Sequence, residues 1–144
     1  MLAGLNDFNF KNISNKDFKE DSVREEIISP ILRELGYTSN SIVRSKNLEH
    51  PFLKIGSKKR KVTLIPDYLL KVDERYSFVL DAKKPNEEIK YGDHVEQVYS
   101  YAIHPEIRTK YFSLCNGKEL IVFRTDEDKP ILYFEIIDID NYWE

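Results

Sequence analysis

Cysteine and long apolar runs are scarce in this sequence. Cys115 is the one cysteine among 144 residues, so no disulfide can form within the chain. Low cysteine usage agrees with a reducing compartment, and we expect a cytoplasmic protein. No apolar stretch approaches the roughly 20 residues that span a membrane. The opening residues MLAGLNDFNF have neither the basic nor the apolar region of a signal peptide, so we expect no membrane partner.

An excess of positive charge is also missing. The chain has 22 Lys and Arg against 25 Asp and Glu, a formal net charge of −3. The chain as a whole is therefore not an electrostatic binder of nucleic acid, and any such contact must be local or assisted by a partner. There is no G-x-x-x-x-G-K-[ST] motif and no zinc-spaced set of Cys and His, so we expect no ATP site and no zinc finger.

What is present is the composition of an ordinary globular protein, 41% hydrophobic and 33% charged. This length predicts a single domain over 1–144. Helices are predicted at 22–35 and 93–104, and strands at 42–48, 62–72, 76–84 and 130–137, with a hairpin at 110–125 around Asn116-Gly117. The pattern predicts an α/β fold (α+β mixed): one mixed central sheet flanked by helices, in the order α-β-β-β-α-β-β-β.

Local signals set the expected bounds of the helices. Ser22 and Glu25 have the spacing of a capping box, and Pro30 should kink the helix that they begin or mark a strained turn. Asp93 should cap the second helix. Residues 54–61, KIGSKKRK, are predicted to form a polar loop.

An acid and a base end the strand FVLDAKK (78–84). Because strand side chains alternate, Asp81 and Lys83 project to one face. If the hairpin is symmetric about Glu74, Asp67 lies directly opposite Asp81, with Cβ atoms about 5 Å apart. In one interpretation a bulge shifts the register, and each carboxylate meets solvent or a basic partner. In the other, both carboxylates hold a divalent metal such as Mg²⁺, and Lys83 holds or activates a water for hydrolysis of a phosphodiester.

Several motifs together resemble the PD-(D/E)xK nuclease superfamily. More narrowly, they are similar to the nuclease domain at the N-terminus of type I restriction enzyme R (HsdR) subunits. The motifs that carry the resemblance occur in the family's order: RELGY (33–37), IPDY (65–68), DAKKPN (81–86), QVYSY (97–101) and LCNGKEL (114–120). Each motif is weak alone, but the ordered set is fairly specific and covers roughly residues 18–124. It implies a restriction-endonuclease-like core. The departure is Asp81, where Glu is more usual.

The resemblance also implies site residues. Asp67 and Asp81 would be metal ligands for Mg²⁺ or Mn²⁺, and Lys83 the catalytic lysine. Gln97 and Tyr101 would be accessory residues near the substrate. Helical geometry agrees, because residues four apart share a helix face at the rim of the core. The alternative for Gln97 and Tyr101 is an ordinary polar helix edge.

The first helix holds a further acid. Extended back by one turn, its apolar stripe contains Glu20 and Arg24. These two residues could form an ion pair across one helical turn. Alternatively, Glu20 points into the metal site as a further acidic group, as the family often has.

One basic cluster stands out before the Asp67 strand. Its members are Lys58, Lys59, Arg60 and Lys61. A charge run of this kind is often a solvated loop, but it could also contact a DNA backbone without reading sequence.

The function expected from these observations is a metal-dependent DNA endonuclease domain of a type I restriction-modification system. DNA is the expected partner. Other restriction-modification subunits, or ATP-motor domains outside these residues, would supply specificity and ATP coupling, and the chain would be a fragment or a stand-alone relative. One alternative is a nuclease-like fold that binds nucleic acid or a protein partner without cleavage. The other is a structural interaction domain whose carboxylates are ordinary surface charges.

Overall fold

The computed structural model describes residues 5–49, 54–55, 58–59 and 63–143. Its main sheet has six strands in the order β1-β6-β7-β8-β9-β10. Their bounds are Ile42–Arg44, Tyr68–Val72, Arg75–Ala82, Tyr111–Cys115, Glu119–Arg124 and Pro130–Glu135. Neighbouring strands are antiparallel except for β7 and β8, which are parallel. A parallel pair needs a crossover, and the helix α3 (Asp93–Ala102) lies in it.

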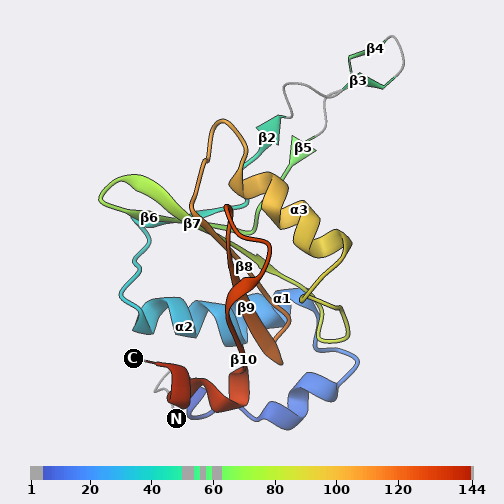
Figure 1. The fold of residues 1–144 in the computed structure, drawn as a ribbon. Coiled ribbons are helices and arrows are strands. Elements are labelled where there is room, and N and C mark those ends of the chain that lie inside the picture. Colours follow the sequence, from blue (N-terminus) through green and yellow to red (C-terminus); the bar gives the residue numbers. More distant parts are fainter. Residues whose placement is uncertain (1–4, 50–53, 56–57, 60–62, 144) are drawn as a thin grey trace.

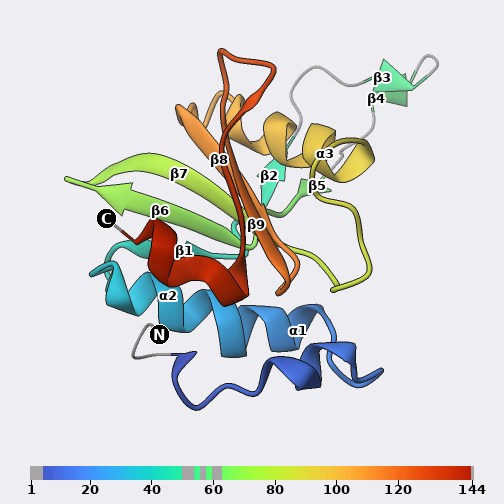
Figure 2. The same cartoon turned by 60° about the horizontal axis from the view of Figure 1, so that its bottom comes forward.

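Helices cover both faces of this sheet (Figures 1 and 2). The first helical region consists of α1 (Glu20–Ser22), a π-helical turn η3 (Val23–Ile28) and α2 (Ser29–Glu34). Its buried stripe packs on one face with Tyr68 and Leu80. The helix α3 buries Val98 and Ala102 on the other face with Leu69 and Val79. The mixed sheet, the flanking helices and the predicted order α-β-β-β-α-β-β-β are thus confirmed.

The first helical region departs from its prediction at the cap, and Pro30 disturbs it locally. It begins at Glu20, so Ser22 lies in the first turn, where its hydroxyl accepts the backbone N–H of the N-cap residue Lys19 at 3.3 Å. The predicted capping box of Ser22 with Glu25 is therefore wrong. Pro30 produces a π-helical turn before it, in which the Ser29 N–H donates to the Arg24 carbonyl five residues back. Proline lacks an N–H, and the wider turn accommodates this loss without ending the helix.

Two of the predicted strands are interrupted. The strand expected at 42–48 ends at Arg44, because Ser45 has a φ of 51°, and a short strand β2 (Leu48–Glu49) follows. The strand expected at 62–72 is divided into β5 (Thr63–Leu64) and β6, with Pro66 and Asp67 between them. The short strands β2 and β5 pair with each other in a separate sheet. The predicted loop 54–61 contains the paired strands β3 (Lys54–Ile55) and β4 (Lys58–Lys59).

The turn between β8 and β9 is closed by the side chain of Asn116. Asn116 accepts the backbone N–H groups of Lys118 and Glu119 at 3.0 and 2.8 Å, as expected of the predicted hairpin.

A short helix η2 (Phe10–Ser14) precedes α1, and a helix η4 (Ile136–Tyr142) follows β10. The helix α3 is capped by Gly92 rather than by the predicted Asp93. In the described ranges, no helix has the length and apolar character that crossing a membrane requires.

Candidate functional site

The hairpin of β6 and β7 keeps the predicted register at its open end, beside Asp67 and Asp81. Tyr68 pairs with Leu80 and Leu69 with Val79, the register that brings Asp67 opposite Asp81. A bulge does occur, but it lies toward the turn, between Leu70 and Lys71. The turn itself is at Asp73 and Glu74, whose φ values of 51° and 64° suit a tight hairpin. The prediction takes the hairpin as symmetric about Glu74, whereas the turn consists of Asp73 and Glu74 and shifts the register by one residue. The bulge shifts the register back, so the two aspartates still face one another.

Each aspartate accepts a hydrogen bond from the backbone of the other's strand. The Asp67 N–H donates to Oδ1 of Asp81 at 2.8 Å. The Ala82 N–H donates to Oδ2 of Asp67, also at 2.8 Å. Pro66 interrupts strand pairing just before Asp67, and the Asp67 N–H therefore meets a carboxylate instead of a ladder carbonyl. These two bonds hold both carboxyl groups in place.

Lys83 joins the aspartates to the helix α3. Its Nζ lies 3.3 Å from Oδ2 of Asp81 and donates to Oε1 of Gln97 at 3.1 Å. Both Asp81 and Lys83 are buried, with 4% and 8% of their surface exposed. Tyr101, one helical turn beyond Gln97, is buried beside them. Burial and the nearby charges of Asp81, Asp67 and Glu20 raise the pKa of its phenol.

Arg24 links the first helical region to the same site. Its Nη1 donates to Oε1 of Glu20 at 2.8 Å and to Oδ1 of Asp67 at 3.2 Å, and its other terminal nitrogen pairs with Asp21. Tyr68 donates its hydroxyl to the Arg24 carbonyl at 3.3 Å, which holds the backbone there. Glu20 thus forms the ion pair considered as one alternative, and the same guanidinium connects it to Asp67.

Asp81 is hard to ionise in its buried position, and each carboxylate of the pair has one cationic partner, Arg24 for Asp67 and Lys83 for Asp81. Burial, and secondarily the charge of Asp67, raises the pKa of Asp81 to about 7, well above its ordinary value of 3.8. In the described part of the chain, no three His, Cys, Asp or Glu side chains group closely enough to hold a metal. Mg²⁺ commonly takes only one or two carboxylates from protein and completes its shell with water and phosphate oxygens. The donor set of Asp67 and Asp81 fits such a hydrated Mg²⁺ or Mn²⁺.

Sequence reasoning missed part of the site. The contact of Arg24 with Asp67 joins residues 43 positions apart, whereas the sequence pattern points only to Glu20, one helical turn away, as a partner of Arg24.

In the predicted basic cluster, Lys58 and Lys59 form β4, whereas Arg60 and Lys61 lie outside the described residues. A contact of this cluster with DNA stays a prediction.

Comparison with known proteins gives a fold relationship. No family model matches the chain, and no curated protein matches it. Its fold is similar to that of a fragment structure assigned as an HsdR subunit of a type I restriction enzyme from Vibrio vulnificus YJ016, with a TM-score of 0.60 and 24% identity. The match covers 80% of this chain and 22% of that one. The chain therefore corresponds to about a fifth of the neighbour's length.

Proposed function

We propose that this chain is a metal-dependent DNA endonuclease domain that hydrolyses phosphodiester bonds in a type I restriction-modification system. The observation that supports this proposal best is the convergence of Asp67, Asp81 and Lys83 at one buried point beside Gln97 of α3. The fold shared with the HsdR fragment supports the restriction context. In that context the protein would act on DNA in the cytoplasm, with other subunits or ATP-motor domains as partners.

The residues have roles that follow from their positions. Asp67 and Asp81 would hold Mg²⁺ or Mn²⁺, which when bound polarises a phosphoryl oxygen and lowers the pKa of a coordinated water. Lys83, fixed by Asp81 and Gln97, would hold the attacking water with its ammonium group. The water oxygen forms a bond to phosphorus while the bond to one ester oxygen breaks. The water's proton leaves to solvent and the departing oxygen gains one, which yields a phosphate monoester and a hydroxyl.

The remaining residues would support this arrangement. Gln97 accepts from Lys83 and so restricts the position of its ammonium group. Tyr101 has a raised pKa and is a phenol at neutral pH, able to donate a hydrogen bond. Glu20 would act through Arg24, whose guanidinium contacts Asp67. The burial of Asp81 argues against the alternative in which these carboxylates are ordinary surface charges.

A second candidate function is nucleic-acid or protein binding without cleavage. Arg24 favours it, since its guanidinium already pairs with both Asp67 and Glu20. A metal at Asp67 would have to share that carboxylate with Arg24 or displace it. Metal binding and cleavage are therefore the properties that separate the two candidates.

A plasmid-nicking assay tests the proposed function. Supercoiled DNA is incubated with the wild-type chain, with and without Mg²⁺ or Mn²⁺, and the open-circular product is measured. We expect metal-dependent nicking by the wild type and about a 100-fold or greater loss in Lys83→Ala, the scale of loss when one positioned hydrogen-bond donor is removed from an active site. Lys110→Ala, prepared identically, is the control, because Lys110 is exposed and outside the site. Equal nicking by wild type and Lys83→Ala would contradict the proposal.

A further inference from the structure

Four lysines surround a cavity where three separate segments meet. The segments are residues 13–19 before α1, residues 84–86 after β7, and Lys118 in the turn between β8 and β9. The cavity has a volume of about 550 Å³. The lysines that line it are Lys16, Lys19, Lys84 and Lys118, and two asparagines, Asn15 and Asn86, line it as well. We call it the lysine groove.

The charge of the lysine groove is opposite to that of the whole chain. Its four lysines are exposed, and none of the described residues that line it carries a carboxylate. Within the described ranges none of the four is in an ion pair. The chain has a net charge of −3, so this gathering of unpaired cations is a local feature of the kind that an anionic ligand requires.

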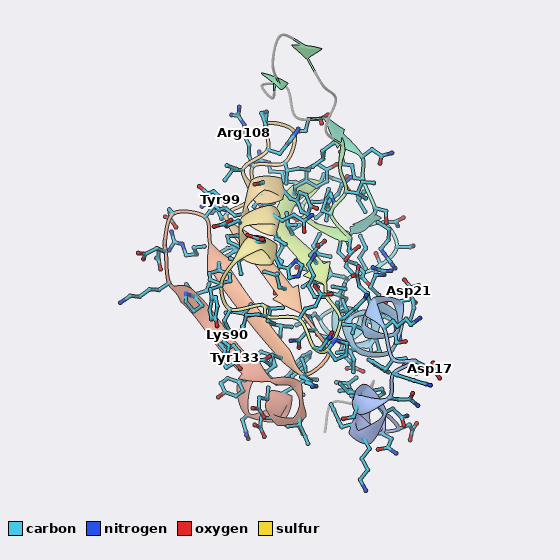
Figure 3. The ribbon with its side chains drawn as sticks, turned by 90° about the vertical axis from the view of Figure 1, so that its right-hand side faces the viewer. Asp17, Asp21, Lys90, Tyr99, Arg108 and Tyr133 are labelled. Carbon is cyan, nitrogen blue, oxygen red and sulfur yellow. The ribbon has the colours of Figure 1, made fainter. Side chains whose placement is uncertain are left out.

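Acidic groups near the lysine groove do not line it. Asp17 and Asp21 lie on the N-terminal segment and on α1, along the right-hand side of Figure 3, and Asp21 pairs with Arg24. Glu119, next to Lys118, accepts from Tyr133 and Asn116 and lies 3.8 Å from Lys90. Figure 3 shows Lys90 and Tyr133 close to one another, away from Asp17 and Asp21. Asp21 therefore has a cationic partner outside the groove, and Glu119 has Lys90 as a partner in addition to the charge of the neighbouring Lys118.

The lysine groove adjoins the candidate active site through the chain itself. Lys19 directly precedes Glu20, which pairs with Arg24. Lys84 directly follows Lys83, which contacts Asp81 and Gln97. Two of the groove lysines are therefore covalent neighbours of residues of the candidate site.

We propose that the lysine groove binds the phosphate backbone of duplex DNA beside the candidate active site. This inference rests on the proposed function, because it names how that site's substrate is held. A duplex is favoured over a single strand by the lining: single-strand sites combine cations with exposed aromatic faces for stacking, whereas Phe18, the aromatic residue in this lining, is 8% exposed. The contacts are with phosphates, so they carry no sequence preference.

Fluorescence anisotropy with short labelled DNA tests the proposal. Binding of the wild-type chain is measured in EDTA against two duplexes of unrelated sequence and a single strand, over a range of salt. The variant K19Q/K84Q is compared with K110Q/K129Q, which loses the same charge from exposed lysines outside the groove. We expect K19Q/K84Q to weaken binding to both duplexes alike. We also expect its salt slope to be about 2 units less steep than that of the control, since each lost phosphate contact removes about one unit.

Further arms separate the possible outcomes. The variant K19R/K84R should restore binding, which excludes misfolding as the cause of the loss. Equal affinity and slope for K19Q/K84Q and K110Q/K129Q, or tighter binding of the single strand than of either duplex, would overturn the proposal. Because binding is measured in EDTA, it is independent of cleavage. If the wild-type chain nicks plasmid and K19Q/K84Q binds DNA as tightly as the wild type, the proposed role of the groove is refuted and the nuclease function is not. A chain that binds through the groove but never nicks refutes the nuclease function alone.

Discussion

At the scale of single residues, the burial of Asp81 beside Asp67 is the feature of the site with a measurable electrostatic consequence. Each carboxylate accepts a backbone N–H at 2.8 Å, yet burial and the second carboxylate still raise the pKa of Asp81 to about 7. The ionised form of Asp81 is therefore disfavoured in the folded chain relative to the unfolded one. This penalty should make stability depend on pH.

We predict that the metal-free chain loses stability as pH rises from about 4 to about 7. The folded state binds the Asp81 proton more tightly than the unfolded state, whose carboxyl group has the ordinary pKa of 3.8. The penalty is absent below that value, grows across this window and is constant above it. Urea unfolding in EDTA, compared between wild type and Asp81→Asn, isolates this effect. If the unfolding free energies of wild type and Asp81→Asn show the same dependence on pH, the prediction is contradicted.

Residue patterns in the sequence predicted much of the site. Alternation along β7 places Asp81 and Lys83 on one face, and the hairpin register places Asp67 opposite Asp81. Both signals are local in the sequence. The position of Arg24 could not be predicted in the same way, because its contact with Asp67 depends on how the first helical region crosses the sheet. The lysine groove was missed for the same reason: its cations come from three segments, and none of those segments is strongly basic.

At the scale of elements, the hairpin of β8 and β9 packs its turn against the first helical region. Gly117 has a φ of 88°, and a Cβ there would lie 3.2 Å from Cγ2 of Val23. Gly36 has a similar φ of 93°, but a Cβ at that position would meet nothing within 4 Å. The two glycines thus separate the cost of backbone conformation from the cost of crowding.

We predict that Gly117→Ala destabilises the chain more than Gly36→Ala. The left-handed backbone costs about 1–2 kcal/mol at either position, and crowding against Val23 adds about 1–3 kcal/mol at position 117. Chemical denaturation of both variants measures the difference. In a Val23→Ala background the cost of Gly117→Ala should fall. An unchanged cost there would show that Val23 is not the residue that excludes a side chain.

Elements were predicted best where periodicity was sustained, and least well where single residues changed the backbone. The six main strands and α3 follow from apolar patterns and turn signals. The π-helical turn before Pro30 and the break at Pro66 do not, since a proline predicts a disruption but not its form. Only the first two residues of η4, Ile136 and Ile137, were expected in a strand, and the helix that follows from them packs Ile136 and Ile139 into the core.

At the scale of the whole molecule, Cys115 reports on the integrity of the core between the sheet and the first helical region. It ends the central strand β8, has no exposed surface, and burial raises its pKa to about 12. A thiol reagent attacks the thiolate, so modification requires that the core between the sheet and the first helical region open around Cys115.

We predict that Cys115 reacts with a thiol reagent only when this core opens. In Lys129→Cys, the added thiol on an exposed residue should react at once, while Cys115 reacts slowly in the same molecule. Urea should accelerate the second phase in proportion to the unfolded fraction. Mass spectrometry of the labelled peptides distinguishes the two sites, and equal rates at both sites in native buffer would contradict the prediction.

The parallel pairing of β7 with β8 determines the order in which the chain can assemble. The hairpins β6–β7, β8–β9 and β9–β10 close over short turns and form locally. The parallel pair closes a much longer loop, and such contacts are the slow steps of folding. Since α3 lies within that loop, the bond from Lys83 to Gln97 belongs to the late step. A nascent chain that has formed its hairpins therefore holds both aspartates but lacks the completed site, and the site arises together with the final cooperative transition.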